Sequence, residues 1–383
     1  MPRAAAVLLI ALPLHAQLTG VFSAQSDHPA IQYASRPVRD PVSRLNQRIR
    51  TGTAQLKFSG RSGYLRSVLE ALDVPVTSQL AVFAKNSLQA RIISPQNPRT
   101  IFFNDSVSIA WVPGEPFVEA ASTDPEQGVI FYTLNQTPVD QPQFTRSDGP
   151  CLSCHENYSS LGVPGMLLRS VFPAPTGLPI RTMGDFNPDH RTAHEQRWGG
   201  WFVTGNVGPL RHMGNSIMNA ESPVTISPRL DGDVYLSTSS DVVALMVFDH
   251  QMHMTNLLTR LNWELRLAAY EHKPFDMAGA AKEVVDYMTF ADEAPLPNRI
   301  QGTSGFAEEF AAKGPRDHRG RSLREFDLQS RLMRYRCSYM IYSEAFDALP
   351  STARQAIYQR MRKTLPPPTI EILRDTRKDF ADH

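Results

Sequence analysis

The chain has 383 residues, of which 42% are hydrophobic, 9% aromatic and 20% charged, as is typical of a soluble globular protein. This composition excludes disordered, collagen-like and multi-span membrane proteins. The 39 basic residues balance 38 acidic ones without a long block of either sign, so the charge pattern does not indicate binding to nucleic acid or to a membrane surface. The length predicts two or three structural units.

The N-terminus has the pattern of an export signal. Arg3 is followed by an uncharged, mostly apolar run, residues 4–14, which is too short to span a bilayer. Small residues allow cleavage after Ala16 or Ser23, so we expect residues 1–23 to be a signal peptide; the alternative is a buried N-terminal helix. No other run of eighteen apolar residues occurs. The mature protein is therefore predicted to be periplasmic or otherwise exported, without an integral membrane segment.

The next two regions differ in character. Residues 24–60 are polar and basic and are predicted to be a tether. Residues 61–140 are predicted to form a small α+β unit, which begins with an amphipathic helix near residues 64–74. Short β-rich runs separated by turn residues follow it, at 80–84, 100–103, 107–112, 117–121 and 129–134.

Two of the three cysteines lie in the sequence Cys151-Leu152-Ser153-Cys154-His155. This Cys-x-x-Cys-His pattern attaches c-type haem: the two thiols add to the porphyrin vinyl groups, and the adjacent histidine binds the iron. The motif predicts one covalent haem c, with His155 as the proximal ligand. Two other possibilities stay open, a disulfide or thiol redox pair in an oxidising compartment and, with less support, a zinc site.

Residues 141–235, which include this motif, are rich in Pro, Gly and aromatic residues, and we expect them to form a loop-rich haem-binding segment. A porphyrin is a large apolar body on which aromatic side chains can pack. The candidates are Phe172, Trp198, Trp201 and Phe202, which could equally be ordinary core residues.

Residues 236–383 are predicted to be helical. The expected helices cover 240–271, 281–290, 323–349 with a break, 351–364 and 369–380. Cys337, the third cysteine, lies in an apolar stretch and is predicted to be a small buried residue rather than a reactive thiol.

The second axial position of the iron has several candidates. His212 and Met213 lie between Gly208 and Gly214, as in a loop that crosses a haem face, and Met213 is slightly favoured. His250 lies on the apolar stripe of a predicted helix, where a histidine is more often a core residue than a ligand. Further candidates are Met166, Met183, His190, His194 and His253, and an open sixth site is a further alternative.

The chain resembles a family of uncharacterised, exported mono-haem c-type cytochrome domain proteins. The resemblance begins upstream of the haem motif and covers the whole mature chain. It rests on short pieces in a shared order: 78–79, 93–95, 103–105, 131–134, the Cys-x-x-Cys-His motif, 169–173, 195–205, 211–215, 250–251, 302–306 and 327–329. It implies that Cys151 and Cys154 are the thioether sites and that His155 is the proximal ligand. No substrate follows from it.

We therefore expect a periplasmic mono-haem c-type cytochrome that transfers one electron at a time between redox partner proteins. The alternative is a haem-dependent enzyme or a small-ligand or redox sensor with an open sixth iron site. An electron carrier is favoured because no paired catalytic acid and base stands out. The chain is nevertheless longer than a simple carrier needs, and its oligomeric state is not predicted.

Overall fold

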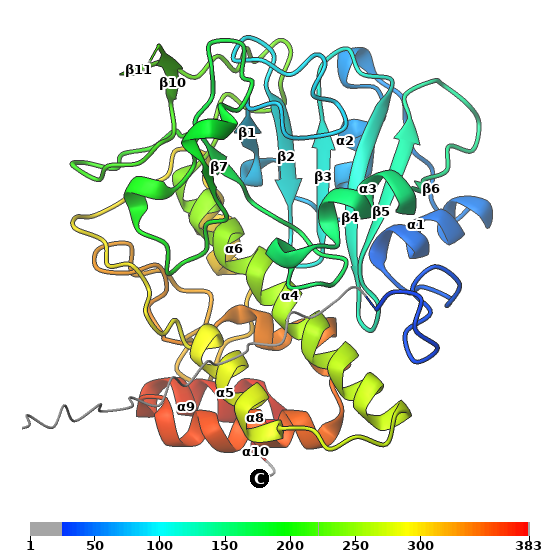
Figure 1. Cartoon of the computed structure of the whole chain (residues 1–383), viewed down its shortest axis with the longest axis vertical. Coiled ribbons are helices and arrows are strands. Elements are labelled where there is room, and N and C mark those ends of the chain that lie inside the picture. Colours follow the sequence, from blue (N-terminus) through cyan, green and yellow to red (C-terminus); the bar gives the residue numbers. More distant parts are fainter. Residues whose placement is uncertain (1–24, 221, 382–383) are drawn as a thin grey trace, which may run out of the picture.

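The computed structural model describes residues 25–220 and 222–381 (Figure 1). The predicted export signal therefore lies outside the described residues. Within them, an antiparallel sheet of seven strands has the order β6-β5-β4-β3-β2-β1-β9. Its strands are β1 (Leu80–Val82), β2 (Arg99–Phe103), β3 (Val107–Trp111), β4 (Phe117–Asp124), β5 (Gly128–Asn135), β6 (Thr145–Arg146) and β9 (Trp201–Phe202).

The five predicted β-runs are confirmed as β1 to β5, and their residues face two hydrophobic layers. Because successive side chains of a strand point to opposite faces, Ile101 and Phe103 pack on one face and Phe102 on the other. The first face is covered by the long helix α4 (Val242–Tyr270), and the second by α1 (Pro41–Arg50) and α2 (Leu65–Ala71). The fold is therefore α+β, as predicted, with the sheet between two layers.

Part of the predicted tether is a packed helix. In α1, Val42, Leu45 and Ile49 recur at helical spacing and are buried against the sheet. Asp40 caps the helix by accepting hydrogen bonds from the amides of Val42 and Ser43. Residues 41–50 thus do not belong to a separate linker, because the basic side chains of α1 lie outward while its apolar stripe joins the core.

The predicted units share one core. Strand β9 comes from the predicted haem-binding segment, yet Trp201 pairs with Val82 at the edge of the main sheet. The hydrophobic layer under α4 includes side chains from β1 to the C-terminal helices. The rest of the 141–235 segment contains α3 (Asp148–His155) and two small hairpins, formed by β7 (Ser170–Val171) with β8 (Asp185–Phe186) and by β10 (Ser216–Asn219) with β11 (Ser222–Thr225).

The C-terminal region is mostly helical, and α4 crosses one face of the sheet as the longest described helix (Figure 1). The helices predicted for 240–271, 281–290, 351–364 and 369–380 are confirmed in outline. The described elements are α4, α5 (Met277–Met288), α6 (Phe306–Ala312), α7 (Glu344–Asp347), α8 (Ser351–Thr364), α9 (Pro367–Thr376) and α10 (Lys378–Ala381). No described helix is both long and apolar enough to cross a membrane.

The prediction of a helix from residue 323 is wrong, because residues 323–338 form turns instead. The Arg324 guanidinium stacks 4.5 Å from the Phe310 ring and 4.7 Å from the Tyr339 ring. Asp327 accepts hydrogen bonds from the backbone amides of Gln329 and Ser330. These hydrogen bonds from the Asp327 side chain compete with the backbone hydrogen bonds of a helix. Arg324 is buried by its aromatic contacts, whereas a helix would need a row of apolar residues on its buried side.

Asp241 is expected to be a large contributor to stability. One carboxylate oxygen caps α4 at Val243, and the other accepts from the amides of Thr303 and Ser304, with Asp241 itself fully buried. Asp241→Ala should lower the free energy of unfolding by roughly 3 kcal/mol, because α4 loses its cap while the amides of Thr303 and Ser304 lose their acceptor. Urea unfolding measures this. Asp276→Ala removes an exposed cap of α5 and should cost only about 1 kcal/mol; equal losses would contradict the prediction.

Candidate functional site

The residues of the haem motif lie on α3, which packs against β5 (Figure 1). Cys151, Cys154 and His155 occupy positions i, i+3 and i+4, which share one side of a helix. Both cysteines are free thiols, Cys151 half-buried and Cys154 exposed. The helix therefore presents two unpaired thiols and an imidazole together, as covalent attachment of a porphyrin requires.

Local sequence explains where α3 begins and how the chain leaves it. Pro150 lies in the first turn, where its missing amide hydrogen costs nothing. After the helix, Leu161 and Gly162 both adopt positive φ, at 61° and 74°. This left-handed turn reverses the chain direction. As a result, Gly165 returns to the end of α3 and lies beside His155.

His155 is held at both ends by Gly165. The amide of Gly165 donates to the His155 carbonyl, and the Gly165 carbonyl lies 2.9 Å from His155 Nδ1. Since a carbonyl can only accept, Nδ1 carries the hydrogen. Burial lowers the pKa of His155, so the ring is neutral and its lone pair lies on Nε2. No hydrogen bond to Nε2 occurs within the described residues, which leaves this atom available to a metal.

The sheet beneath α3 supplies an apolar wall and an ion pair. The Phe131 ring of β5 lies 4.7 Å from the His155 ring. Arg99 on β2 and Glu119 on β4 form an ion pair of 2.5 Å across β3. Burial, and to a smaller extent Glu119, raises the pKa of the Cys151 thiol.

The two favoured distal candidates lie in a separate loop, and within the described residues no hydrogen bond or ring contact joins either of them to His155. Met213 Sδ lies 3.5 Å from the hydroxyl of Ser170, which donates to it. His212 lies with its ring centroid 5.5 Å from that of Trp198, and its Nδ1 is buried without a hydrogen-bond partner among the described residues. Burial lowers the pKa of His212.

His250 is fully engaged elsewhere. Its Nδ1 lies 2.9 Å from Nδ1 of His190, and its Nε2 lies 2.7 Å from the Ser338 hydroxyl. The ring stacks 4.3 Å from Phe290 and 5.1 Å from Tyr287. Ligation by His250 would require both hydrogen bonds to break. His250 is therefore a core histidine, as its position on an apolar helix stripe favours.

The other distal candidates differ in how deeply they are buried. His190 and His194 are buried, and His253 lies near Asp189, with 3.9 Å between His253 Nδ1 and the carboxylate. Met183 is exposed, whereas half-buried Met166 follows Gly165 directly. Met166 is therefore the candidate closest along the chain to the carbonyl that holds His155.

The aromatic residues that were proposed to contact haem are mainly core residues. Trp198 is fully buried and its indole donates to Asp249 at 3.0 Å, while Trp201 donates to the Arg169 carbonyl. Phe202 lies on the opposite face of the sheet, 4.7 Å from Phe83. Phe172 is half-buried against Phe186. Cys337 is completely buried, and burial raises its pKa, which confirms the prediction of a small buried residue.

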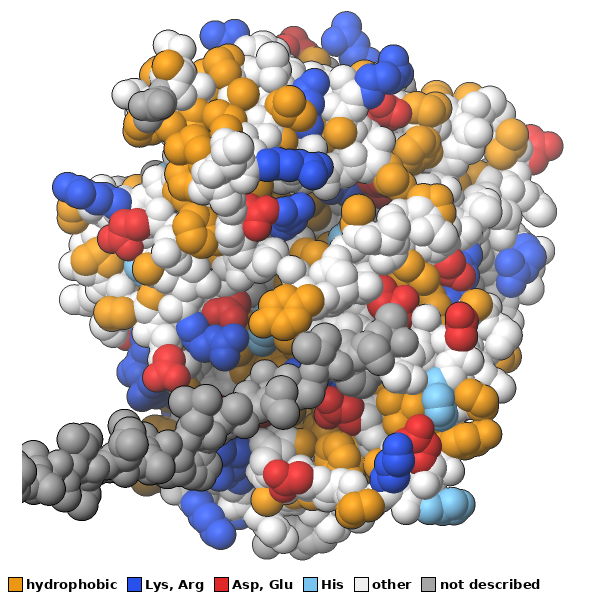
Figure 2. Space-filling view, in the orientation of Figure 1, with side chains coloured by type: hydrophobic (Ala, Val, Ile, Leu, Met, Phe, Trp, Pro, Cys, Tyr) orange, Lys and Arg blue, Asp and Glu red, His pale blue; other side chains and the backbone are white. Residues whose placement is uncertain are grey.

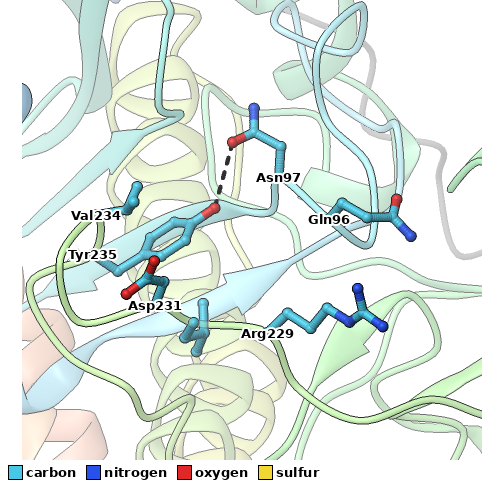
Figure 3. Close-up of a pocket in the computed structure, with 7 residues that line it drawn as sticks. Gln96, Asn97, Arg229, Asp231, Val234 and Tyr235 are labelled. Atoms are coloured by element: carbon cyan, nitrogen blue, oxygen red, sulfur yellow. Dashed lines mark hydrogen bonds between the residues drawn. The ribbon is translucent and has the colours of Figure 1, made fainter.

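Two other polar features do not include the motif. A cavity of about 490 Å³ is lined by residues that Figure 3 shows, where the Tyr235 hydroxyl points toward Asn97 Oδ1 at 3.5 Å. Asp317, His318 and Asp375 gather near the C-terminus, but Asp317 already pairs with Arg321. Neither contains a predicted site residue.

Gly165 and Phe131 are the site residues that the sequence did not reveal. Gly165 lies ten residues after His155, and Phe131 comes from a strand, so no local spacing connects either of them to the motif. Comparison with known proteins gave no match to a family model, a curated protein or a solved structure.

Proposed function

We propose that this protein is an exported mono-haem c-type cytochrome that transfers single electrons between periplasmic redox partners. Cys151 and Cys154 form the thioether bonds, and His155 binds the iron through Nε2. The observation that carries the proposal is the state of these groups on α3: two free thiols and a neutral imidazole whose Nδ1 hydrogen is held by Gly165. The bound haem would supply the one-electron redox chemistry.

The surroundings of α3 support a large apolar cofactor. Phe131 places a buried aromatic ring beside His155, and Arg99 next to Glu119 supplies a guanidinium, the group that bonds carboxylates. The resemblance of the sequence to exported mono-haem cytochrome domain proteins favours the same cofactor and compartment. Met213 is our first distal candidate and His212 our second, because His250 has no free ring nitrogen.

The surface also suits a protein partner. On the face in Figure 2, hydrophobic side chains gather at the upper left, over the segments with β7, β10 and β11. The exposed large apolar residues of these segments include Leu178, Met183 and Val224. Contiguous apolar surface of this kind marks interaction sites, and redox partners dock on small surfaces of this type.

The test is expression of the whole chain, leader included, in a host that matures c-type cytochromes. The protein should be recovered from the periplasm, and its haem should stay with the polypeptide after denaturation and extraction with acidified organic solvent. Haem that extracts from the unmutated protein would show that no thioether bond forms. Cytoplasmic recovery of the uncleaved chain would contradict the export part of the proposal.

A haem enzyme or ligand sensor with an open sixth site is the second candidate. The hydrogen bonds that the distal candidates already make favour this second candidate. Met213 Sδ accepts from the Ser170 hydroxyl, and both ring nitrogens of His250 are hydrogen-bonded. In that case a small ligand, rather than a side chain, would bind the iron.

Carbon monoxide separates the two candidates. If Met213 or His212 binds the iron, the resting haem should be low-spin, and carbon monoxide should bind slowly because a side chain must leave first. Met213→Ala or His212→Ala should then accelerate binding by at least about tenfold, whereas His250→Ala should leave the spin state unchanged. A high-spin unmutated protein that binds carbon monoxide at once would favour the enzyme or sensor. Stopped-flow absorption measures both quantities.

A further inference from the structure

Three consecutive residues after the haem motif each bond to a different element. The Pro164 carbonyl accepts from the amide of Val129 in β5, and Gly165 bonds twice to His155. Met166 bonds twice to a side chain of α4: its amide donates to Asn256 Oδ1 at 3.1 Å, and its carbonyl accepts from Asn256 Nδ2 at 2.9 Å. Asn256 therefore bonds to the backbone of Met166 as a neighbouring strand would.

The position of Asn256 is unusual for an amide. It is 1% exposed and lies in a helix segment whose neighbours, such as Leu257 and Leu258, are buried apolar residues. A buried amide is costly unless it is hydrogen-bonded, and here both bonds go to the backbone of Met166, the residue directly after Gly165. Gly165 also fits closely, because an added Cβ would collide with Asn256 Oδ1.

We propose that Asn256 is a positioning residue for the proximal iron ligand. This proposal rests on the proposed function, since it assigns Asn256 a role toward the haem that His155 would bind. Asn256 accepts a hydrogen bond from the Met166 amide, which shares a peptide unit with the Gly165 carbonyl. Asn256 therefore fixes the direction of that carbonyl, and the carbonyl holds the Nδ1 hydrogen of His155. The contacts run without a gap from α4 to the imidazole.

The expected consequence is electronic as well as geometric. A strong hydrogen bond from Nδ1 makes the imidazole a better electron donor through Nε2, which favours ferric over ferrous iron. Releasing the Gly165 carbonyl weakens that bond. The reduction potential should then rise, even though Asn256 touches neither the haem nor His155.

The experiment uses the full-length holoprotein with covalent haem. Asn256→Leu keeps the side-chain size but loses both hydrogen bonds, and Gly165→Ala displaces Asn256 from the other side. Both variants should raise the midpoint potential. Exchange of the His155 Nδ1 hydrogen with deuterium, followed by NMR of the reduced protein, should become about tenfold faster, which corresponds to an Nδ1 hydrogen bond weakened by about 1.4 kcal/mol.

Asn262→Leu is the matched control. Asn262 is a buried amide of the same helix, but its Nδ2 donates to the Ala348 carbonyl, away from the motif. It should lose stability with no change in potential or exchange. Equal shifts in Asn256→Leu and Asn262→Leu, or none in Asn256→Leu and Gly165→Ala, would overturn the inference.

The unmutated holoprotein provides a measurement that does not depend on folding of the variants. If its Nδ1 hydrogen exchanges too fast to follow, no carbonyl holds it and the inference is wrong, although the proposed function stands. If the unmutated protein carries no covalent haem, the proposed function itself is wrong.

Discussion

Replacement of both motif cysteines, Cys151→Ala with Cys154→Ala, is expected to abolish covalent haem completely. Each thioether needs one thiol, and the described chain has no other thiol near α3, because Cys337 is buried in the C-terminal region. Haem bound only through His155 should dissociate on denaturation. The measurement is haem-stained gel electrophoresis of denatured protein, with the polypeptide quantified separately.

The single variants refine this prediction. Cys151→Ala and Cys154→Ala should each retain some haem through one thioether, with a red-shifted reduced spectrum from the remaining vinyl group. Cys337→Ala is the control and should keep full haem content, with a stability loss of about 1 kcal/mol from the small cavity. Haem that remains on the double variant after denaturation would rule out thioether attachment at this motif.

Acid is expected to destabilise the protein strongly, because several histidines are buried in the neutral form near α4 and α5. Burial, assisted by Arg197, lowers the pKa of His194 to about 4, and burial also lowers that of His253 to about 4. Burial lowers the pKa values of His190 and His250 well below the usual range. In the unfolded chain these histidines titrate near pH 6.5.

The direction follows from proton uptake. Below about pH 6.5 the unfolded chain binds protons that the folded chain does not, so stability falls as the pH falls toward 4. His194 and His253 should each account for about 2 kcal/mol between pH 7 and 5. Asp249 opposes this trend, since burial raises its pKa to about 7 and its folded form then gains stability on acidification, by about 2 kcal/mol. His190 and His250 add to the loss.

We therefore expect a net loss of at least about 2 kcal/mol between pH 7 and 5, to which His190 and His250 add, measured by urea unfolding at each pH. His194→Leu should reduce this loss by about 2 kcal/mol, because it removes one buried neutral histidine that takes up a proton when the chain unfolds. His272→Asn is the control: this histidine is exposed, and Asn tolerates its positive φ of 54°. An unchanged pH dependence in His194→Leu would contradict the assignment.

The sequence predicted the elements whose pattern is local. Strands β1 to β5 and helices α4 and α8 were expected because period-two and helical spacing of apolar residues are properties of neighbouring positions. The helix predicted for residues 323–338 is absent for the opposite reason. Its apolar residues suggested a helix, but Arg324 is bound by Asp105, Phe310 and Tyr339, which are distant in sequence. Such long-range contacts leave no periodic signal.

The sequence by itself determined the chemistry of the motif, because a helix places Cys151, Cys154 and His155 together whatever surrounds it. Only the tertiary structure decided which groups hold them. Gly165 is brought to His155 by a left-handed turn, and Asn256 is brought to Met166 by α4, ninety residues away. Tertiary structure likewise pairs His250 with His190 and Ser338. Hydrogen bonds act over about 3 Å, so partners far apart along the chain are chosen only when the sheet and helices pack.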